Sequence, residues 1–240
     1  MARIALVTGG TRGIGAAISI ALQQAGRHVI ANYAGNTAAA EAFAKETGIE
    51  TAKFDACDYE QCAAAIADIA ARHGTIEILV NNAGITRDAV IGKMSRDMWD
   101  AVIDTNLGSV FNLSKACYNG MKANKFGRIV NIGSINGQAG QYGQVNYAAA
   151  KSGIHGFTKA LSLEGARYGI TVNAIAPGYV DTEMVRAVPP DVLEKIIARI
   201  PRGRLGSTED VARGVIFLTA DDADFITGST LSINGGQHMV

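Results

Sequence analysis

The stretch that decides the fold is IALVTGGTRGIGAAISIALQQAG, residues 4–26. It opens with a short apolar run that stops at glycines, as expected of a strand buried on both faces of a sheet. Ile14, Ile18 and Leu22 then recur at every fourth position, the spacing of one helix face, and Gly26 stands where a helix would end. The stretch therefore predicts a strand, a glycine-rich turn and a helix.

The same alternation continues to the end of the chain. After the first strand at 4–7, strands are expected at 28–32, 51–55, 77–80, 128–132, 171–175 and 230–233. Helices are expected at 37–47, 59–72, 98–121 and 146–168. Strand-like runs separated by helices predict an α/β fold, a doubly wound parallel sheet of seven strands with helices on both faces and right-handed crossovers.

Two connections are longer than such a sheet needs. They cover residues 133–145 and 177–206, and the second is expected to contain a short helix at 191–199. Both follow the carboxyl ends of expected strands, where ligands bind in parallel sheets, and loops of this length are usually lids or binding loops. The part around 179–206 is therefore predicted to be a substrate lid, with Met184, Val185 and Val188 as apolar cover.

The composition excludes several classes of protein. With 48% hydrophobic and 18% charged residues among 240, the chain can form a full core, and no linker divides residues 1–240, so a single domain is expected. Lys plus Arg and Asp plus Glu number 22 each, which leaves no overall field for nucleic acid or a membrane surface. No apolar run approaches the ~18 residues of a membrane span.

The cysteines and the start of the chain indicate where the protein works. Cys57, Cys62 and Cys117 are odd in number and lack zinc-ligand spacing, so structural thiols in a reducing compartment and no metal are expected. The first apolar run after Arg3 is too short for a signal peptide. A cytoplasmic location is therefore expected.

The glycine turn at residues 8–15 has the spacing G-x-x-x-G-x-G. Missing side chains would let a pyrophosphate approach the N–H groups at the helix start, although a tight turn without a ligand also explains them. The second strand is followed by Tyr33 and Ala34 rather than by the acid that would bind the ribose 2′-hydroxyl of NAD. Together with Arg12 this favours a 2′-phosphate and hence NADPH, the alternative being that Arg12 is a solvated surface charge.

Tyr147 and Lys151 are four residues apart and share one face of an expected helix. An ammonium beside a phenol favours the phenolate, so the pKa of Tyr147 is expected to be lowered towards neutrality, where it can exchange a proton with a carbonyl oxygen. Ser134, in the preceding long connection, can donate to the same oxygen. The alternatives are an amphipathic surface pair and a helix-cap or turn serine.

Several further stretches carry a resemblance that covers the whole chain. They are the turn at 8–15, Asn81-Asn82-Ala83-Gly84, Asn106 within Asp104–Leu107, Ser134, the Tyr147–Lys151 segment and Pro177-Gly178. In this combination and order the chain resembles the short-chain dehydrogenases/reductases. The resemblance implies a Rossmann-type, NAD(P)-dependent oxidoreductase.

The same resemblance implies roles for individual residues. Tyr147 would be the acid/base, Ser134 would orient the carbonyl, Lys151 would lower the pKa of Tyr147 and hold the nicotinamide ribose, and Asn106 would bend its helix and hold a water of the proton relay. The implied cofactor-binding residues are Gly9, Thr11, Arg12, Gly13, Ile14, Gly15, Tyr33, Asp55, Asn82, Ala83, Gly84, Tyr147, Lys151, Pro177, Gly178 and Thr182. A homotetramer, formed partly by the helices at 98–121 and 146–168, is also implied.

Within this family the chain resembles reductases of 3-oxoacyl thioesters. Residues 82–88 and 104–107 carry that likeness, and residues 136–147 and 234–239 look closest to the acetoacetyl-CoA reductases. This implies an acyl-CoA substrate, with NADPH-dependent reduction of acetoacetyl-CoA to (R)-3-hydroxybutyryl-CoA. The expected substrate-binding residues are Ser134, Gln141, Gln144, Tyr147 and Tyr179.

Two other functions are considered. A 3-oxoacyl-(acyl-carrier-protein) reductase shares nearly every motif, and Lys122, Lys125 and Arg128 would then form a docking patch for the acidic carrier, unless they are simply a solvated helix end. A nucleotide-sensing scaffold without catalysis is the remote alternative. Such a scaffold should have lost the serine, the tyrosine or the lysine, and this chain has all three.

Overall fold

The structure is a computed structural model, and it describes residues 2–186 and 188–239. A sheet of seven strands forms its centre, with every pair of neighbours parallel and the order β3-β2-β1-β4-β5-β6-β7. The strands are β1 (Ile4–Val7), β2 (His28–Tyr33), β3 (Glu50–Lys53), β4 (Ile76–Asn81), β5 (Gly127–Ile132), β6 (Ile170–Pro177) and β7 (Thr230–Ile233). The expected seven-stranded parallel sheet is confirmed, and the order reverses between β1 and β4.

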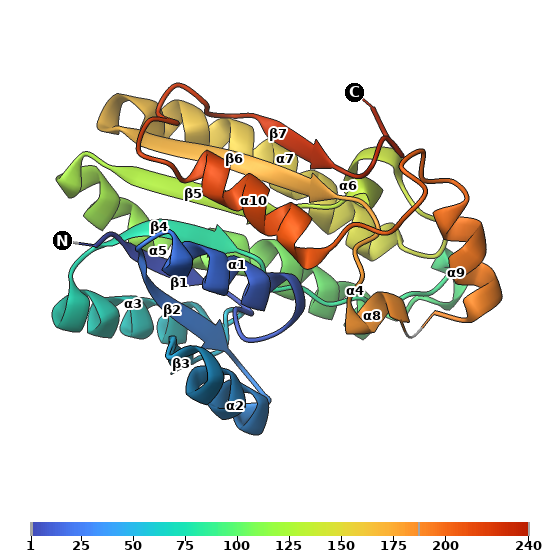
Figure 1. Cartoon of the computed structure of the whole chain (residues 1–240), viewed down its shortest axis with the longest axis horizontal. Coiled ribbons are helices and arrows are strands. Elements are labelled where there is room, and N and C mark those ends of the chain that lie inside the picture. The colour runs from blue at the N-terminus through green and yellow to red at the C-terminus, as the bar shows by residue number, and fades with distance from the viewer. Residues whose placement is uncertain (1, 187, 240) are drawn as a thin grey trace.

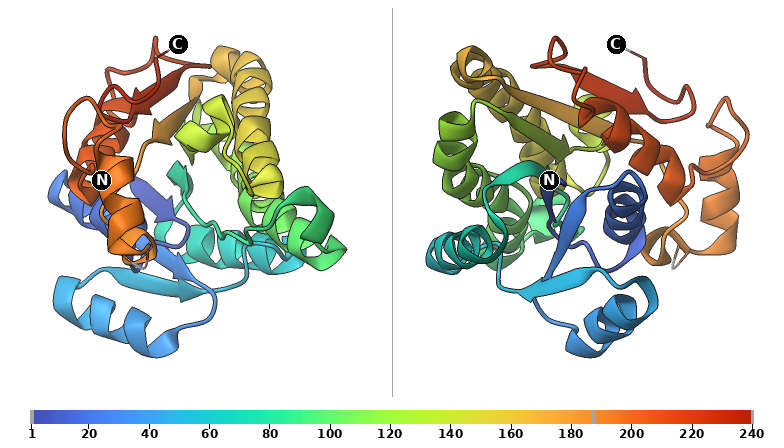
Figure 2. Two further views of the ribbon diagram at one scale, coloured as in Figure 1. Left: turned by 90° about the vertical axis from the view of Figure 1, so that its right-hand side faces the viewer. Right: turned by 60° about the vertical axis from the view of Figure 1, so that its left-hand side comes forward.

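Helices cover both faces of the sheet (Figures 1 and 2). One face carries α1 (Gly13–Gln24), α2 (Thr37–Thr47) and α10 (Thr208–Leu218), and the other carries α3 (Tyr59–His73), α5 (Ser109–Asn124) and α7 (Val145–Gly165). Strand β1 shows why two layers form, because Ala5 and Val7 face the first group of helices and Ile4 and Leu6 face the second. A strand that is apolar at every position is thus buried on both sides.

The structure differs from the sequence-based expectation in three elements. The helix expected at 98–121 is divided into α4 (Arg96–Ile103), a π-helical turn (Asp104–Gly108) and α5. The connection at 133–145 contains α6 (Ile135–Ala139), and α10 was not predicted at all. Its signal was nevertheless present, since Ser207 and Asp210 form a capping box ahead of the apolar residues Val211, Val215 and Leu218.

The remaining elements are short. They are the 3₁₀ turns Ile91–Lys93 and Ala166–Tyr168, and the helices α8 (Glu183–Arg186) and α9 (Pro190–Ile197). In the part of the chain that the structure describes, no helix has both the length and the apolar character needed to cross a membrane.

The segment expected to form a lid lies beyond the carboxyl ends of the strands, where α8 and α9 project (Figure 1). Its two ends meet at a bridge between Val180 and Gly206, with Asp181 N donating to Gly206 O at 2.8 Å. The segment therefore leaves and rejoins the body at one place. Of the apolar cover expected there, the side chain of Met184 lies outside the described residues.

Candidate active site

The backbone conformation of the turn after β1 requires glycine at several positions. Gly9 and Gly13 have φ angles of 59° and 51°, in the left-handed region that favours glycine. A Cβ on Gly15 would lie 2.1 Å from the carbonyl oxygen of Gly9, so no side chain fits at this position. The turn thus holds the N-terminus of α1, with its free N–H groups, against the carboxyl end of β1. The side chain of Ile14 packs into the core beneath it.

Thr8 and Asn82 join the two strand ends that flank the reversal of strand order. The hydroxyl oxygen of Thr8 accepts hydrogen bonds from the backbone N–H groups of Asn82 and Ala83, both at 2.9 Å. The amide of Asn82 donates back to Thr8 O at 2.9 Å. Asn82 and Ala83 thereby lie beside the glycine turn, while their contact with a cofactor stays a prediction. The role of Thr8 was missed because a threonine at a strand end carries no distinctive signal.

Arg12 is exposed at the N-terminus of α1, where it is the N-cap residue without a side-chain capping bond. The first turn of this helix holds no acidic residue, and no carboxylate of residues 2–186 and 188–239 forms an ion pair with Arg12. A guanidinium at the positive end of a helix dipole is unfavourable by itself. The arrangement therefore suits an anion that binds both the N–H groups and Arg12.

The end of β2 offers no acid to a ribose. Asn32 is buried, its side-chain oxygen accepts from Gly9 N at 3.3 Å, and its amide donates to Phe54 O at 2.9 Å. Asn32 therefore stabilises the glycine turn through its side-chain hydrogen bonds and is not free to bind a ribose. Tyr33 follows it at the strand end, partly exposed.

The serine, tyrosine and lysine come together beyond the carboxyl end of β5. The Nζ of Lys151 lies 5.7 Å from the ring centroid of Tyr147 and donates to Ile132 O at 2.7 Å. The Ser134 hydroxyl oxygen caps α6 by accepting from Asn136 N at 3.1 Å, and Ser134 is close enough to Tyr147 to lower the pKa of the phenol. Ser134 is thus both a cap and a neighbour of the phenol, so the two interpretations of this serine are compatible.

The pKa of Tyr147 differs in direction from the expected lowering. Burial raises this pKa, and the neighbouring Ser134 only partly offsets the rise. Lys151 does not reverse it, because its own burial lowers the pKa of the ammonium to about 8 and its proton is directed at Ile132 O. Tyr147 is therefore protonated at neutral pH, the state that a proton donor needs.

The rate of carbonyl reduction should fall as the pH rises through about 8. Lys151 carries its charge below its lowered pKa of about 8 and loses it above, and the charge supports the phenolate left when Tyr147 gives up its proton. Initial rates from about pH 6 to about pH 10 measure this limb. Lys159→Ala, which removes an exposed lysine of the same helix, should leave the limb in place. A rate that stays constant up to about pH 10 would contradict this assignment.

Asn106 lies in the π-helical turn and is fully buried. Its amide donates to Ile85 O and Val102 O, both at 2.9 Å, and its oxygen accepts from Ile85 N at 3.1 Å. The helix is thus interrupted at Asn106 by a π-helical turn, while a bend caused by Asn106 stays a prediction. Because both amide hydrogens are used, the side chain holds the backbone after β4, and its contact with a relay water stays a prediction.

Gly84 brings Asn106 and Lys151 close to each other. A Cβ at Gly84 would lie 2.5 Å from Asn106 Oδ1 and 3.7 Å from Lys151 Nζ. All four expected catalytic residues therefore belong to one neighbourhood at the carboxyl edge of the sheet.

Two of the expected substrate residues differ in their surroundings. Gln141 is exposed, whereas the amide of Gln144 is occupied at both ends, accepting from Asn136 Nδ2 at 2.9 Å and donating to Asp88 Oδ2 at 2.8 Å. Gln144 thus ties the connection before α7 to the one after β4. Any contact it makes with a substrate would have to replace one of these bonds.

Asn146 positions the start of α7 and was missed in the sequence. It is fully buried, and its amide donates to Arg87 O at 2.9 Å and Met98 O at 3.1 Å. Its oxygen accepts from Tyr147 N at 2.8 Å. The direction in which the Tyr147 ring leaves the helix is therefore fixed by its neighbour.

Two of the expected cofactor residues that follow β6, Gly178 and Thr182, lie next to segments far away in the sequence. Pro177 ends β6, and Gly178 has no room for a side chain because a Cβ would lie 2.8 Å from Asn234 Cα. The methyl group of Thr182 lies 3.9 Å from the position that a Cβ on Gly13 would take.

Asp55, the residue expected to reach the cofactor after β3, is exposed, and its Oδ1 accepts a hydrogen bond from Cys57 N at 2.9 Å.

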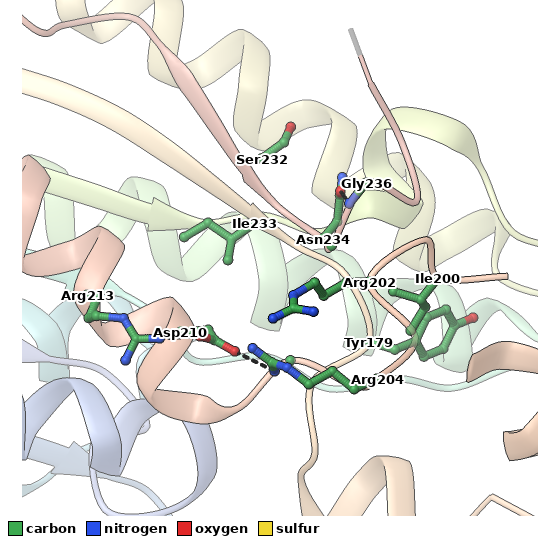
Figure 3. Close-up of a pocket in the computed structure, with 12 residues that line it drawn as sticks. Tyr179, Ile200, Arg202, Arg204, Asp210, Arg213, Ser232, Ile233, Asn234 and Gly236 are labelled. Carbon is green, nitrogen blue, oxygen red and sulfur yellow. Dashed lines mark hydrogen bonds and ion pairs between the residues drawn. The ribbon is translucent and has the colours of Figure 1, made fainter. Parts of the chain in front are cut away.

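Tyr179 lines the hollow drawn in Figure 3. This cavity of about 310 Å³ lies between the return of the lid segment, α10 and the end of β7. Arg204 and Arg213 both pair with Asp210, while Arg202 lacks an ion pair within the described ranges. Ser134 and Tyr147 are not among the residues that line this cavity.

The basic patch considered for carrier docking does not form. Arg128 is 1% exposed and stacks on Phe126 with 4.2 Å from its Cζ to the ring centroid. Its guanidinium donates to carbonyl oxygens of Gly127, Gly169, Ala220 and Asp221. Lys122 stacks over Tyr168 at 4.5 Å, which fits the solvated helix end. Arg128 is therefore structural.

Comparison with known proteins agrees with this geometry. The family model described as enoyl-(acyl carrier protein) reductase matches residues 9–238. The chain belongs to the short-chain dehydrogenase/reductase family of oxidoreductases.

Several similar proteins carry the name acetoacetyl-CoA reductase. The proteins of this name from Shinella zoogloeoides and Rhizobium meliloti (strain 1021) are each 61% identical to this chain, over 100% of this chain and 100% of the relative. A 3-oxoacyl-(acyl-carrier-protein) reductase of Salmonella typhimurium is 45% identical over 99% of this chain and 98% of its own length. The chain is thus similar to proteins of both names, and of these three the two acetoacetyl-CoA reductases have the higher identity.

Proposed function

We propose that this enzyme reduces acetoacetyl-CoA to (R)-3-hydroxybutyryl-CoA with NADPH. The observation that carries the reaction type is the joining of Ser134, Tyr147 and Lys151 at the carboxyl edge of the sheet, with a tyrosine whose raised pKa keeps it protonated. The substrate is supported by the names of the relatives that are 61% identical over their full length. The (R) configuration rests on the resemblance to the same group.

The residues present fit a nicotinamide dinucleotide. Gly9, Gly13 and Gly15 leave the helix N-terminus open to a pyrophosphate, and a side chain at Gly84 would fill the space beside Lys151. Lys151 is the residue that would hold the nicotinamide ribose. NADPH, when bound, supplies a hydride for C3 of the thioester.

The chain's own residues supply the proton and stabilise charge. Tyr147 donates its phenolic proton to the C3 carbonyl oxygen as negative charge develops there. The Ser134 hydroxyl donates a hydrogen bond to the same oxygen from a position fixed by α6. Lys151 stabilises the phenolate that remains, which a neutral amine at this place would not do.

NADPH is proposed over NADH because of two features at the adenosine side. The end of β2 presents Tyr33 with no acid, and Arg12 offers a cation that lacks an internal partner in the described chain. A 2′-phosphate would interact with both Arg12 and the positive end of α1.

The substrate is proposed to be a short acyl chain on CoA. Gln141, and Gln144 if it releases Asp88 or Asn136, would hydrogen-bond the thioester carbonyl or the pantetheine amides. A long acyl chain would have to desolvate these amides without bonding to them. Residues 179–206, with Tyr179 at their start, would close over the thioester as a lid of the single domain formed by residues 1–240.

The alternative, reduction of a carrier-protein thioester, is supported by the relative that is 45% identical. The structural role of Arg128 weakens it, because the basic patch that would meet an acidic carrier is missing at this place. The values of kcat/KM on acyl-CoA thioesters of four to ten carbons, and on one carrier-protein thioester, separate the two. Short CoA thioesters should give the highest value, and a steady rise with chain length or a strong preference for the carrier would support the alternative.

The particle is proposed to be a homotetramer that works in the cytoplasm. On α5, within the helix expected to pair, Val110 and Leu113 lie in the chain's own core, whereas Phe111 is 52% exposed. Leu163 on α7 is 83% exposed, and Phe217 and Phe225 are 55% and 99% exposed on and after α10. Two separate apolar surfaces suit two kinds of subunit contact.

Light scattering of the purified protein should therefore give four times the chain mass of 25.0 kDa at micromolar concentration. Phe225→Asp adds charge at the most exposed of these side chains and should shift the particle to a smaller assembly. A monomer mass for the unmodified protein would contradict the proposal.

A further inference from the structure

Two histidines and a glutamate converge at the amino edge of the sheet, away from the catalytic residues. His28 begins β2, Glu50 begins β3 and His73 ends α3. The Nε2 atoms of His28 and His73 lie 3.6 and 2.9 Å from the same carboxylate oxygen, Glu50 Oε2. One nitrogen of each ring and this oxygen all lie within 4.8 Å of one another. The residues are too far apart in sequence to be recognised by spacing, and no metal was expected from the sequence.

The hydrogen bonds of this cluster cannot all be satisfied by protein groups. His28 Nε2 is buried and has no hydrogen-bond partner in the part of the chain that the structure describes. His73 Nε2 lies 2.9 Å from the Glu50 oxygen and 2.8 Å from Arg72 Nη1. A ring nitrogen either donates or accepts, so it cannot serve the carboxylate and the guanidinium together. A cation that accepts all three lone pairs would resolve both conflicts.

We propose that His28, Glu50 and His73 bind a divalent transition-metal ion, for which zinc is the best fit. Zinc bonds of about 2.0–2.2 Å to nitrogen and oxygen in a tetrahedron place neighbouring ligand atoms roughly 3.3 Å apart. The two histidine-to-glutamate separations of 2.9 and 3.6 Å bracket this value, and the two ring nitrogens lie within 4.8 Å of each other, so side-chain rotations could bring all three ligands to one ion. Two imidazoles with one carboxylate suit zinc, whereas magnesium and calcium prefer oxygen ligands. Water would be the fourth ligand.

Arg72 competes with the metal for the same groups. It forms an ion pair with Glu50 Oε1 and a second with Asp68 Oδ2 at 2.9 Å, and its side chain is 42% exposed. The exposed arginine can keep Asp68 and release Glu50 when the ion enters. Removal of Arg72 should therefore strengthen metal binding, whereas loss of a simple structural ion pair would not.

A metal ion here would connect β2, β3 and α3 to one another. These elements start or end at the edge opposite the lid, so the ion would take no part in the reaction at Tyr147. Its effect is expected on the stability of the β2–β3 edge, since an ion that binds the folded chain alone raises its unfolding temperature.

Calorimetric titration of chelator-treated protein with zinc chloride tests the proposal, in a Cys57→Ser background that removes an exposed thiol. One equivalent should bind to the parent and to the matched control His238→Ala. His28→Ala and His73→Ala should each bind at least about 10-fold more weakly, the typical loss of a ligand or its support. Arg72→Ala should bind more tightly, and magnesium should not bind.

Two further readouts keep the test independent of any folding defect. Cobalt in place of zinc should give the visible absorption of a four-coordinate ion in the parent and in Arg72→Ala, and zinc should raise the unfolding temperature of both. Glu50→Gln, nearly the same shape as the carboxylate, should lose both effects while keeping a folded circular-dichroism spectrum. Absent zinc binding, or equal binding by the parent, His28→Ala and His73→Ala, would overturn the proposal.

Discussion

Tyr147→Phe should lower kcat by at least about 100-fold, the lower range for a lost general acid, while affinity for the cofactor changes little. The substitution removes one oxygen from a ring that the backbone bond to Asn146 and the packing of α7 keep in place. The C3 oxygen then loses its proton donor but keeps the hydrogen bond from Ser134. The kcat is measured by NADPH oxidation at saturating thioester, and cofactor affinity by fluorescence titration.

Tyr118→Phe is the matched control for this variant. Its hydroxyl donates to Glu164 O at 3.1 Å at an exposed place on α5, so its loss should leave kcat unchanged. Near-normal turnover of Tyr147→Phe, with Tyr118→Phe also normal, would end the mechanism proposed here.

Arg12→Ala should weaken NADPH binding by about 10- to 150-fold and NADH binding far less. A charge-assisted hydrogen bond to the 2′-phosphate contributes roughly 1.5–3 kcal/mol, which corresponds to that range. The lower part of the range applies if the phosphate stays hydrated, because Arg12 is exposed. Dissociation constants for both cofactors, measured with the parent and the variant, give the ratio directly.

Arg27→Ala removes an arginine at the opposite end of α1, where it pairs with Asp221 at 3.3 Å. It should leave both dissociation constants unchanged. Equal losses for the two cofactors in Arg12→Ala, or a parent protein that prefers NADH, would refute the assignment of the 2′-phosphate.

Apolar runs and residue spacing within a short stretch of sequence were enough to predict several helices and strands. The apolar run at Ile4–Val7 and the fourfold spacing after Gly13 predicted β1 and α1, and the spacing of Tyr147 and Lys151 predicted their shared face. These signals depend on the helix and strand periods alone. The capping box of α10 is equally local and was overlooked.

The remaining features depend on contacts between residues far apart in the chain. The amide of Asn81 on β4 donates to Asn131 on β5, whose amide donates to Thr158 on α7, and this buried chain of bonds cannot be seen in any one segment. The pKa of Tyr147 rises for the same reason, since distant segments bury the phenol. From the sequence, Arg128 was expected to be a surface charge in a patch with Lys125. In the structure it lies on β5 and donates to four carbonyl oxygens of residues far from it in the chain or beside it.

The most direct test of the proposed function is the reaction of purified protein with acetoacetyl-CoA and NADPH, followed by the loss of absorbance near 340 nm and by chiral analysis of the product. We expect one NADPH to be oxidised for each (R)-3-hydroxybutyryl-CoA formed, at a kcat/KM above that with NADH and above that with a carrier-protein thioester. No oxidation of NADPH, an (S) product, or a much faster reaction with the carrier-protein thioester would contradict it.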